Sequence, residues 1–437
     1  MKKKRIVAIL GALVLLFAWM GPAFARPYEP ITKVKDWLYD NYYTDMYGFV
    51  ELRNGWRLQD DPYQKDASLA EGRMQLDFST DLKWGWLKLV GDLGYDFVED
   101  KEIAGLRELN IAFSPVKFMD VKAGRQVLTW GTGDLLFIND LFPKDWKSFF
   151  IGRDTEYLKA PSDALKTSLF SDAVNVDLVY VPQFNNSNYI DGSRISYWNS
   201  LLGRTAGRDF VFADHERNSF ARDSELAARL WKNIGSTETA LYGYYGFWKT
   251  PEGVQPGATL TDYRLFYPRL AVAGGSLRTT VFEGIGNVEI GYYESLDDQS
   301  GDDPFVRNSE IRFLTGYEQE IGRNFTGAVQ YYLEYMQDYD DYERTLPLTS
   351  RQKDEFRHVL TLRLTKMYLN QTLKLSLFVY FSPSDQDSYW RPQLNYKITD
   401  NWALDVGANI FAGSEDYTFF GQFEDATNAY VGLRYSF

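Results

Sequence analysis

The chain has 437 residues, a formal net charge of −13, 17% aromatic residues, 34 glycines and no cysteine. The absence of cysteine excludes disulfides, thiolate metal sites, c-type haem attachment and a lipoprotein anchor. Hydrophobic residues make up 45% of the chain, yet its mean hydropathy is −0.37, so the apolar residues do not form long blocks. This composition is typical of a transmembrane β-barrel, and a secreted soluble β-protein remains the alternative.

The first 25 residues have the pattern of a secretory signal peptide. Residues 2–5 are basic, residues 6–20 are apolar, and residues 23–25 read small-x-small. The apolar run is shorter than the roughly 20 residues that a spanning helix needs. We therefore expect cleavage near Ala25.

A periplasmic N-terminal segment over residues 26–46 is expected to follow the signal. Ile31, Val34 and Leu38 recur at helical spacing after Pro30, which predicts a short amphipathic helix before the first strand. Such a helix either covers part of the periplasmic mouth or packs on its rim as a tether.

The remainder, residues 47–437, alternates between apolar and polar residues in segments bounded by Gly, Asn, Asp or Pro. Segments of this length suit tilted strands that cross a bilayer. We predict an antiparallel up-and-down transmembrane barrel of about 18 strands, with a range of about 16 to 18. The predicted strands are 47–58, 68–80, 84–97, 105–115, 117–128, 164–170, 173–182, 222–232, 236–248, 267–282, 286–296, 306–320, 324–337, 354–367, 371–382, 388–398, 401–413 and 426–437.

The connections alternate between short and long. Tight turns follow the even-numbered strands, whereas long polar segments follow several odd-numbered ones: 129–163, 183–221, 249–266 and 338–353. Outer-membrane barrels have short periplasmic turns and long extracellular loops. This asymmetry predicts that both termini lie in the periplasm. Aromatic residues near the segment ends are expected to form interfacial girdles: Trp84, Trp86, Trp248, Tyr267, Trp390 and Trp402.

The segment 129–163 is too apolar for a loop that is exposed to water. Its apolar residues will be buried, and folding into the barrel mouth is one way to bury them; packing on the outer rim or on a neighbouring subunit is the other. In the inward arrangement, its polar residues would line a constriction: Asp134, Asn139, Asp140, Lys144 and Asp145.

Strand parity places a basic wall on the late strands and a mixed wall on the first four. The inward positions of the late strands are basic: Arg357, Arg363, Lys374, Arg391, Lys397 and Arg434. If the acidic loop faces this wall, the resulting field favours anionic solutes or sugar acids. The alternative is that these charges pair across a water-filled lumen.

The last strand carries a resemblance to a known class. Residues 428–437 alternate and end on Phe437, with Leu433 and Tyr435 on the same face. This resembles the closing strand of Gram-negative outer-membrane barrels, in which a terminal aromatic belongs to the signal that the barrel-assembly machinery reads. The resemblance implies an assembly signal formed by Phe437, Tyr435 and Leu433.

A second resemblance covers about residues 105–145. Leu106-Arg107-Glu108-Leu109, Phe113-Ser114-Pro115, Ala123-Gly124-Arg125-Gln126 and Trp130-Gly131 with Asp134 resemble the hairpin and following loop of barrels allied to alginate-export porins. The resemblance implies a passive or facilitated pore and identifies no substrate.

The functional hypothesis is an outer-membrane porin-like channel for small polar solutes. The expected partners are outer-membrane lipid, lipopolysaccharide, the barrel-assembly machinery and a small polar solute; we expect no nucleic acid, no cofactor and no metal, and the oligomeric state stays open. The alternatives are an export channel, a structural sheath around a partner protein and, less favoured, a lipid-hydrolysing barrel enzyme. His215 and His358 are the only histidines, and no motif joins either to a nucleophile.

Overall fold

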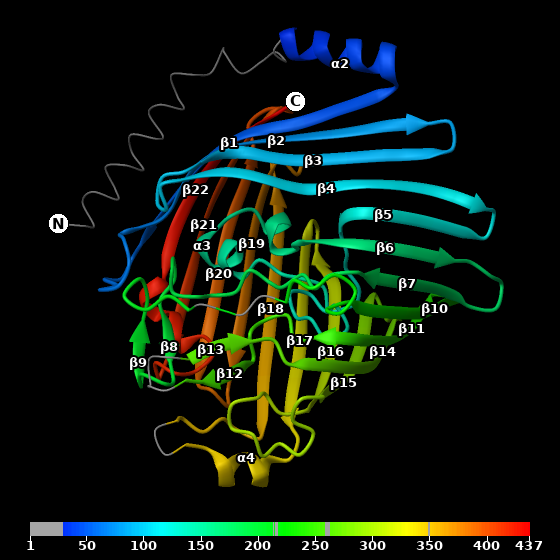
Figure 1. The fold of residues 1–437 in the computed structure, drawn as a ribbon. Coiled ribbons are helices and arrows are strands. Elements are labelled where there is room, and N and C mark those ends of the chain that lie inside the picture. The colour runs from blue at the N-terminus through cyan, green and yellow to red at the C-terminus, as the bar shows by residue number, and fades with distance from the viewer. Residues whose placement is uncertain (1–28, 213, 215–216, 258–262, 348–349) are drawn as a thin grey trace.

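The protein is described here by a computed structural model that covers residues 29–212, 214, 217–257, 263–347 and 350–437. The predicted signal peptide and its cleavage site near Ala25 lie outside these residues. Eighteen strands form one sheet that closes on itself (Figure 1). They are β1 (Thr44–Arg57), β2 (Ala67–Leu82), β3 (Gly85–Asp96), β4 (Lys101–Val116), β5 (Met119–Val127), β6 (Pro161–Leu169), β7 (Asn175–Val181), β10 (Glu225–Ile234), β11 (Thr237–Phe247), β14 (Arg269–Val281), β15 (Gly284–Ser295), β16 (Glu310–Gly322), β17 (Phe325–Met336), β18 (Phe356–Tyr368), β19 (Leu373–Ser382), β20 (Asp387–Lys397), β21 (Trp402–Gly413) and β22 (Asn428–Ser436).

Each of the eighteen strands pairs antiparallel with the next of the eighteen along the chain, and β1 pairs with β22 to close the ring. The register at the closure sets Glu51 opposite Arg434 and Leu52 opposite Leu433. The predicted barrel is therefore confirmed, and every predicted strand overlaps an observed one. Closure leaves no free sheet edge in the barrel. A free edge would expose unpaired backbone N–H and C=O groups, which the hydrocarbon core of a bilayer cannot satisfy.

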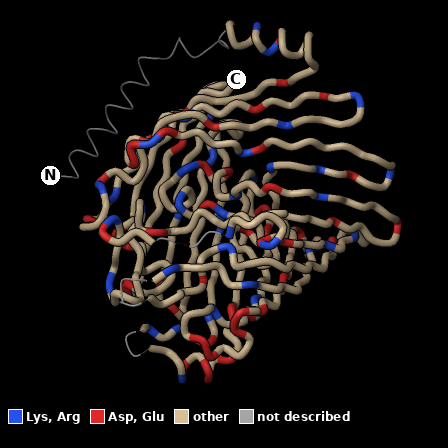
Figure 2. The backbone as a smooth tube through the Cα atoms, viewed as in Figure 1, with Lys and Arg blue, Asp and Glu red and all other residues tan. Residues whose placement is uncertain are grey.

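The side chains alternate across the barrel wall because successive residues of a strand point to opposite faces. On β17, Ala328 and Gln330 are buried inside the barrel, while Val329 between them is 53% exposed on the outer face. Figure 2 shows that charged residues occur along the strands, in the turns and in the loops. The outer face is thus apolar, as the sequence pattern predicts, whereas the inner face carries charged and polar side chains together with aromatic ones.

Two small hairpins within the long loops are absent from the prediction. They are β8 (Tyr197–Asn199) with β9 (Arg204–Ala206), and β12 (Gly253–Pro256) with β13 (Tyr263–Phe266). Their strands have only three or four residues, too few to show a period of two. Short helices also lie in the loops: α3 (Trp146–Ile151), η2 (Thr155–Leu158), α4 (Tyr339–Thr345) and η3 (Gly421–Ala426).

A helix, α2 (Glu29–Tyr42), precedes β1, where the sequence predicts one. It has no buried residue, and the Lys35 ammonium lies 5.0 Å from the centre of the Tyr47 ring. Figure 1 shows α2 near the C-terminus, at the end of the barrel that carries the short turns. Among the described residues, no helix is long and apolar enough to cross a membrane.

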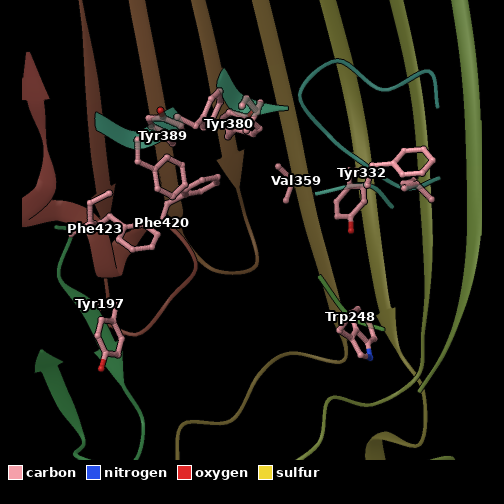
Figure 3. Packing of buried hydrophobic residues seen from close by; sticks show 14 of the residues in the cluster. Tyr197, Trp248, Tyr332, Val359, Tyr380, Tyr389, Phe420 and Phe423 are labelled. Atoms are coloured by element: carbon pink, nitrogen blue, oxygen red, sulfur yellow. The ribbon is translucent and has the colours of Figure 1, made fainter. Parts of the chain in front are cut away.

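The main apolar core lies inside the barrel, between the wall and the loops that enter it. Tyr380, Tyr389, Tyr332 and Val359 point inward from the strands, and Phe420 and Phe423 reach them from a loop (Figure 3). Two of the predicted girdle residues belong to buried clusters instead: Trp248 is 4% exposed and Tyr267 is fully buried. The girdle prediction is wrong for these two because long-loop residues cover them.

Candidate functional site

The connection between β5 and β6 folds into the barrel lumen. It carries α3 and η2, and its apolar residues join the interior core: Ile138, Phe142, Phe149, Phe150, Ile151 and Leu158. The ring of Phe150 packs edge-on against Tyr389 and Phe411, with centroid distances of 5.4 and 5.2 Å. Residues 129–163 are hereafter called the inward loop.

Glu289 of β15 is the first anchor of the inward loop. Its side chain is 1% exposed, and its carboxylate accepts hydrogen bonds from the backbone amides of Thr132, Gly133 and Asn139 at 2.7, 3.2 and 2.8 Å. The Thr132 hydroxyl and the Asn139 side-chain amide donate to the same carboxylate, each at 3.0 Å. Hydrogen bonds to a charged group contribute about 1.5–3 kcal/mol each. One side chain thus fixes the first turn of the loop against the wall.

A second set of contacts continues along the neighbouring strands. Gln330 of β17 accepts from the Asp134 amide at 2.8 Å and donates to the Asp134 carbonyl at 2.9 Å. The Asp134 carboxylate forms an ion pair with Arg363 of β18. The Tyr380 hydroxyl of β19 donates to the Leu135 carbonyl at 3.0 Å. Both the backbone and the side chain of Asp134 are therefore held.

The far end of the inward loop is anchored to the opposite wall. Arg53 of β1 donates to the Gly152 carbonyl at 2.6 Å, and Asn428 of β22 donates to the Phe150 carbonyl at 2.9 Å. Arg153 forms a buried ion pair with Glu71 of β2. In the closed ring of 18 strands, β15 lies eight strands from β1, close to half a circumference, and β17 lies six strands from it. The inward loop therefore crosses the lumen.

The connection between β7 and β10 packs on the inward loop and was missed by the sequence analysis. Arg194 is 5% exposed; its Nε donates to the Ser68 carbonyl at 3.0 Å, and its guanidinium pairs with Asp96 of β3. Lys147 of the inward loop pairs with Asp191 at 2.7 Å. Burial opposes ionisation of Asp191, but Lys147 and Ser193 outweigh it, so the pKa of Asp191 lies below its usual value. The apolar residues Ile190 and Ile195 were the available signal in this segment.

The five predicted constriction residues have different positions. Asn139, Asp140 and Lys144 are 1%, 5% and 3% exposed: Asn139 faces Glu289 on the wall, and Asp140 and Lys144 face each other inside the loop. Lys144 pairs with Asp140 at 2.9 Å, and burial lowers the pKa of Lys144 against the opposing effect of Asp140. Asp145 caps α3 by accepting from the Ser148 amide at 2.8 Å. The expectation that all five line the constriction thus needs correction, because three are used to fold the loop; Asp134 stays partly exposed.

The residues of the predicted basic wall differ in whether they form ion pairs. Arg357 pairs with Asp385 at 2.6 Å, Arg363 with Asp134 and Glu318, and Arg434 with Glu51 at 3.1 Å and Asp154 at 3.0 Å. Asp134 and Asp154 come from the inward loop, so its acids do face this wall. Lys374 and Lys397, near the short-turn end, form no ion pair within the described ranges.

Arg391 differs from the paired arginines. It is 8% exposed, and its guanidinium stacks over the Phe149 ring at 3.8 Å. Its Nε is buried without a hydrogen-bond partner, and no described carboxylate pairs with it. Its cross-strand neighbour is Phe378, and the Tyr380 and Tyr389 rings stack 5.6 Å apart on the same wall. A buried cation without an anion is costly, which makes Arg391 the wall residue most suited to an anionic solute.

The mixed wall of the first strands holds the other end of the inward loop. Arg73 pairs with Glu71 and Asp92, both at 3.1 Å. The Tyr157 hydroxyl of η2 donates to Asp92 at 3.1 Å, and the Arg73 guanidinium lies 4.5 Å from the Tyr157 ring. These inward positions follow from strand parity, but their pairing with η2 depends on the path of the loop.

The predicted assembly residues close the barrel. Phe437 donates to the Gly48 carbonyl at 2.9 Å and accepts from the Gly48 amide at 3.0 Å, which extends the β1 pairing to the last residue. The Tyr435 ring lies 5.0 Å from Trp402, and Leu433 lies opposite Leu404 of β21. A side chain at Gly48 would overlap the Phe437 ring. A role in assembly stays a prediction.

The alternative of a lipid-hydrolysing enzyme would need a histidine beside a nucleophile, and His358 is the one histidine among the described residues. The His358 Nδ1 lies 2.9 Å from the Tyr331 hydroxyl, and the two rings stack. His215 lies outside the described residues. In the described part of the chain, no cluster of three or more His, Asp or Glu can hold a metal ion.

Gly152 ends α3 at a point that requires glycine. Its φ is +88°, and an added Cβ would overlap the Tyr430 ring. We expect Gly152→Ala to destabilise the inward loop by at least about 1–2 kcal/mol from backbone strain alone. Faster proteolysis within residues 129–163, at unchanged strand content by circular dichroism, is the readout.

Gly203→Ala is the matched control, because Gly203 also has a positive φ, +62°, but an added Cβ there meets nothing within 4 Å. If protease cleaves the inward loop equally fast in both variants, the close approach of Gly152 to the Tyr430 ring does not determine the stability of the loop.

No protein-family model matches the sequence, and no curated protein is significantly similar to it. Solved structures share the barrel over 90% of this chain. Acinetobacter baumannii OccAB3 is 11% identical, with a TM-score of 0.54 over 99% of its own length. Pseudomonas aeruginosa OccK2 (OpdF), solved in complex with glucuronate, is 9% identical with a TM-score of 0.53 over 97% of its length, and OccK5 (OpdH) is 11% identical with 0.52 over 98%. These neighbours are outer-membrane porins with 18-stranded barrels, and the similarity shows the fold.

Proposed function

We propose that this protein is an outer-membrane channel for small polar solutes, narrowed by the inward loop and selective for anions such as sugar acids. One observation supports this proposal above the others: the loop crosses the barrel and is anchored on opposite walls, at Glu289 and at Arg53 with Glu71. An 18-stranded barrel is too wide for its wall side chains to fill. A loop fixed at mid-lumen sets the size of what passes.

The charges beside the loop support the preference for anions. Arg391 presents a guanidinium without a carboxylate partner, next to the aromatic faces of Phe149 and Phe378. A guanidinium binds a carboxylate through paired hydrogen bonds, and an aromatic face suits the apolar face of a sugar ring. The glucuronate bound to OccK2 (OpdF), which shares this fold, is a solute of that kind.

The route to the membrane belongs to the same proposal. The chain is exported by a signal peptide cleaved near Ala25, and Phe437, Tyr435 and Leu433 form the assembly signal. The outer surface then contacts phospholipid and lipopolysaccharide. The proposed role is passive transport without catalysis. Kinship with alginate-export porins rests on residues 105–145 alone.

Lys374 and Lys397 provide a clean test of the charge preference. Both are exposed, have the inward parity of Phe378 and Arg391, and form no ion pair in the described part of the chain. Reversing them therefore breaks no ion pair. Lys374→Glu with Lys397→Glu should shift the zero-current potential, measured in a planar bilayer under a salt gradient, toward cation selectivity.

The control reverses two lysines in the short turns of the same rim, Lys83→Glu with Lys117→Glu, for an identical change in net charge. Both lysines are exposed in short turns. If the two double variants move the zero-current potential equally, the lumen lysines have no special part in selectivity.

A further inference from the structure

The short turns of the barrel carry exposed apolar side chains. Eight tight turns join the strands at this end, and seven have a large apolar residue at or beside the turn that is at least 41% exposed. These residues, hereafter the turn ring, are Trp84, Phe118, Phe170, Ile234, Phe282, Ile321 and Leu369. Turns in water favour Gly, Asn, Asp, Ser and Pro. The turn ring therefore has a composition that water does not favour.

Two members of the turn ring are also strained. Phe282 is 93% exposed at φ +51°, and Leu369 is 62% exposed at φ +51°. Glycine or asparagine fits this left-handed conformation at lower cost than a bulky residue. In water, the backbone strain and the exposure of the Phe282 ring and the Leu369 isobutyl group are both unfavourable. Burial of these side chains in an apolar environment would be favourable and would offset the cost of the strain.

The lengths of neighbouring strands point to the same environment. A tilted strand needs about 9–11 residues to cross the hydrocarbon core. Strands β5 and β6 have 9 residues and β7 has 7, and the turns that join β4 to β5 and β6 to β7 carry Phe118 and Phe170. On this side of the barrel, the strands alone barely span the core. Their turns must then lie at the boundary of the bilayer.

We propose that the turn ring is inserted into the headgroup and acyl boundary of the periplasmic leaflet, so that phospholipid covers the short-turn rim. This rests on the proposed placement of the barrel in the outer membrane. Phospholipid fits better than a protein partner because the ring recurs around the circumference, one residue per hairpin. Adjacent hairpins repeat about every 10 Å, whereas a protein hot spot is a contiguous cluster.

The absence of cysteine makes the test specific, since each introduced cysteine is unique. Phe118→Cys, Phe282→Cys and Leu369→Cys are labelled with a nitroxide in the full-length protein, in phosphatidylethanolamine and phosphatidylglycerol vesicles. Val329→Cys, on the outer face of β17, reports lipid, and Glu343→Cys, on exposed α4, reports water. We expect the three turn labels to collide with a water-soluble nickel chelate several-fold less often than the Glu343 label does.

The outcomes separate the two proposals. If the turn labels match the Glu343 label while the Val329 label stays shielded, the rim lies in water and the turn ring is overturned. If the Val329 label also matches Glu343, the barrel is not in the bilayer and the proposed function fails with it. In unlabelled protein, Phe282→Asn with Leu369→Asn should lower the urea midpoint in vesicles; a higher midpoint would contradict insertion, because asparagine relieves the strain.

Discussion

Glu289→Ala should raise the single-channel conductance several-fold and make it noisy. The Glu289 carboxylate accepts five hydrogen bonds from Thr132, Gly133 and Asn139 of the inward loop. Alanine leaves three backbone amides without this acceptor, at about 1–3 kcal/mol for each that stays unsatisfied. The first turn of the loop then detaches from β15, while the contacts of Asp134 and Leu135 with β17, β18 and β19 and those of the far end with β1, β2 and β22 remain. The loop is expected to fluctuate in the lumen and no longer to close it to a fixed width.

Two variants serve as controls for this effect. Glu289→Gln keeps the shape and one acceptor oxygen, so its conductance should lie between those of the native protein and Glu289→Ala. Glu283→Ala removes an exposed carboxylate in the turn before β15 and should change nothing. A native conductance in Glu289→Ala, with native protection of residues 129–163 from protease, would show that this anchor does not control the pore.

Arg391→Met should weaken anion binding while stabilising the barrel, which is the second large effect. A hydrogen-bonded charge contributes about 1.5–3 kcal/mol to binding, so the concentration of glucuronate that half-blocks the current should rise about 10- to 100-fold. The buried guanidinium has no described carboxylate partner, so methionine removes an unpaired charge. The midpoint of thermal unfolding of Arg391→Met in vesicles should therefore be at or above that of the native protein.

The matched control is Arg357→Met, because Arg357 also points inward but pairs with Asp385. That variant leaves a carboxylate unpaired, so it should lose stability with little change in glucuronate block. If Arg391→Met and Arg357→Met lose stability to the same extent and glucuronate blocks the current through both equally well, Arg391 serves only to pack against Phe149.

The barrel could be predicted from the sequence because its cause is local. Water inside and lipid outside impose a period of two on the strands, as on β17, where Ala328 and Gln330 are buried and Val329 between them is exposed. The alternation of short turns and long loops is equally local. Parity alone also predicted a mixed wall on the first four strands, where the structure has buried inward-facing charges: Glu51, Arg53, Glu71, Arg73 and Asp92.

The candidate site could be predicted only in outline. The apolar content of residues 129–163 indicated that this loop is buried, and the barrel mouth was one of the places predicted for it. The anchors were not predictable, because Glu289 is more than 150 residues from the turn that it caps. Asp140 and Lys144 look like pore charges in sequence but neutralise each other inside the loop. Arg194 reaches Asp96 from a loop with weak apolar patterning, and only the folded path of the chain reveals it.

The central claim is an aqueous path narrowed by the inward loop. The most direct test is the current through single molecules of the unmodified, full-length protein in a planar bilayer under a salt gradient. We expect a small, steady conductance with an anion-selective zero-current potential, and we expect glucuronate to shift this potential or to block the current. A barrel that inserts but passes no current, or one that passes large current without charge preference, would contradict it.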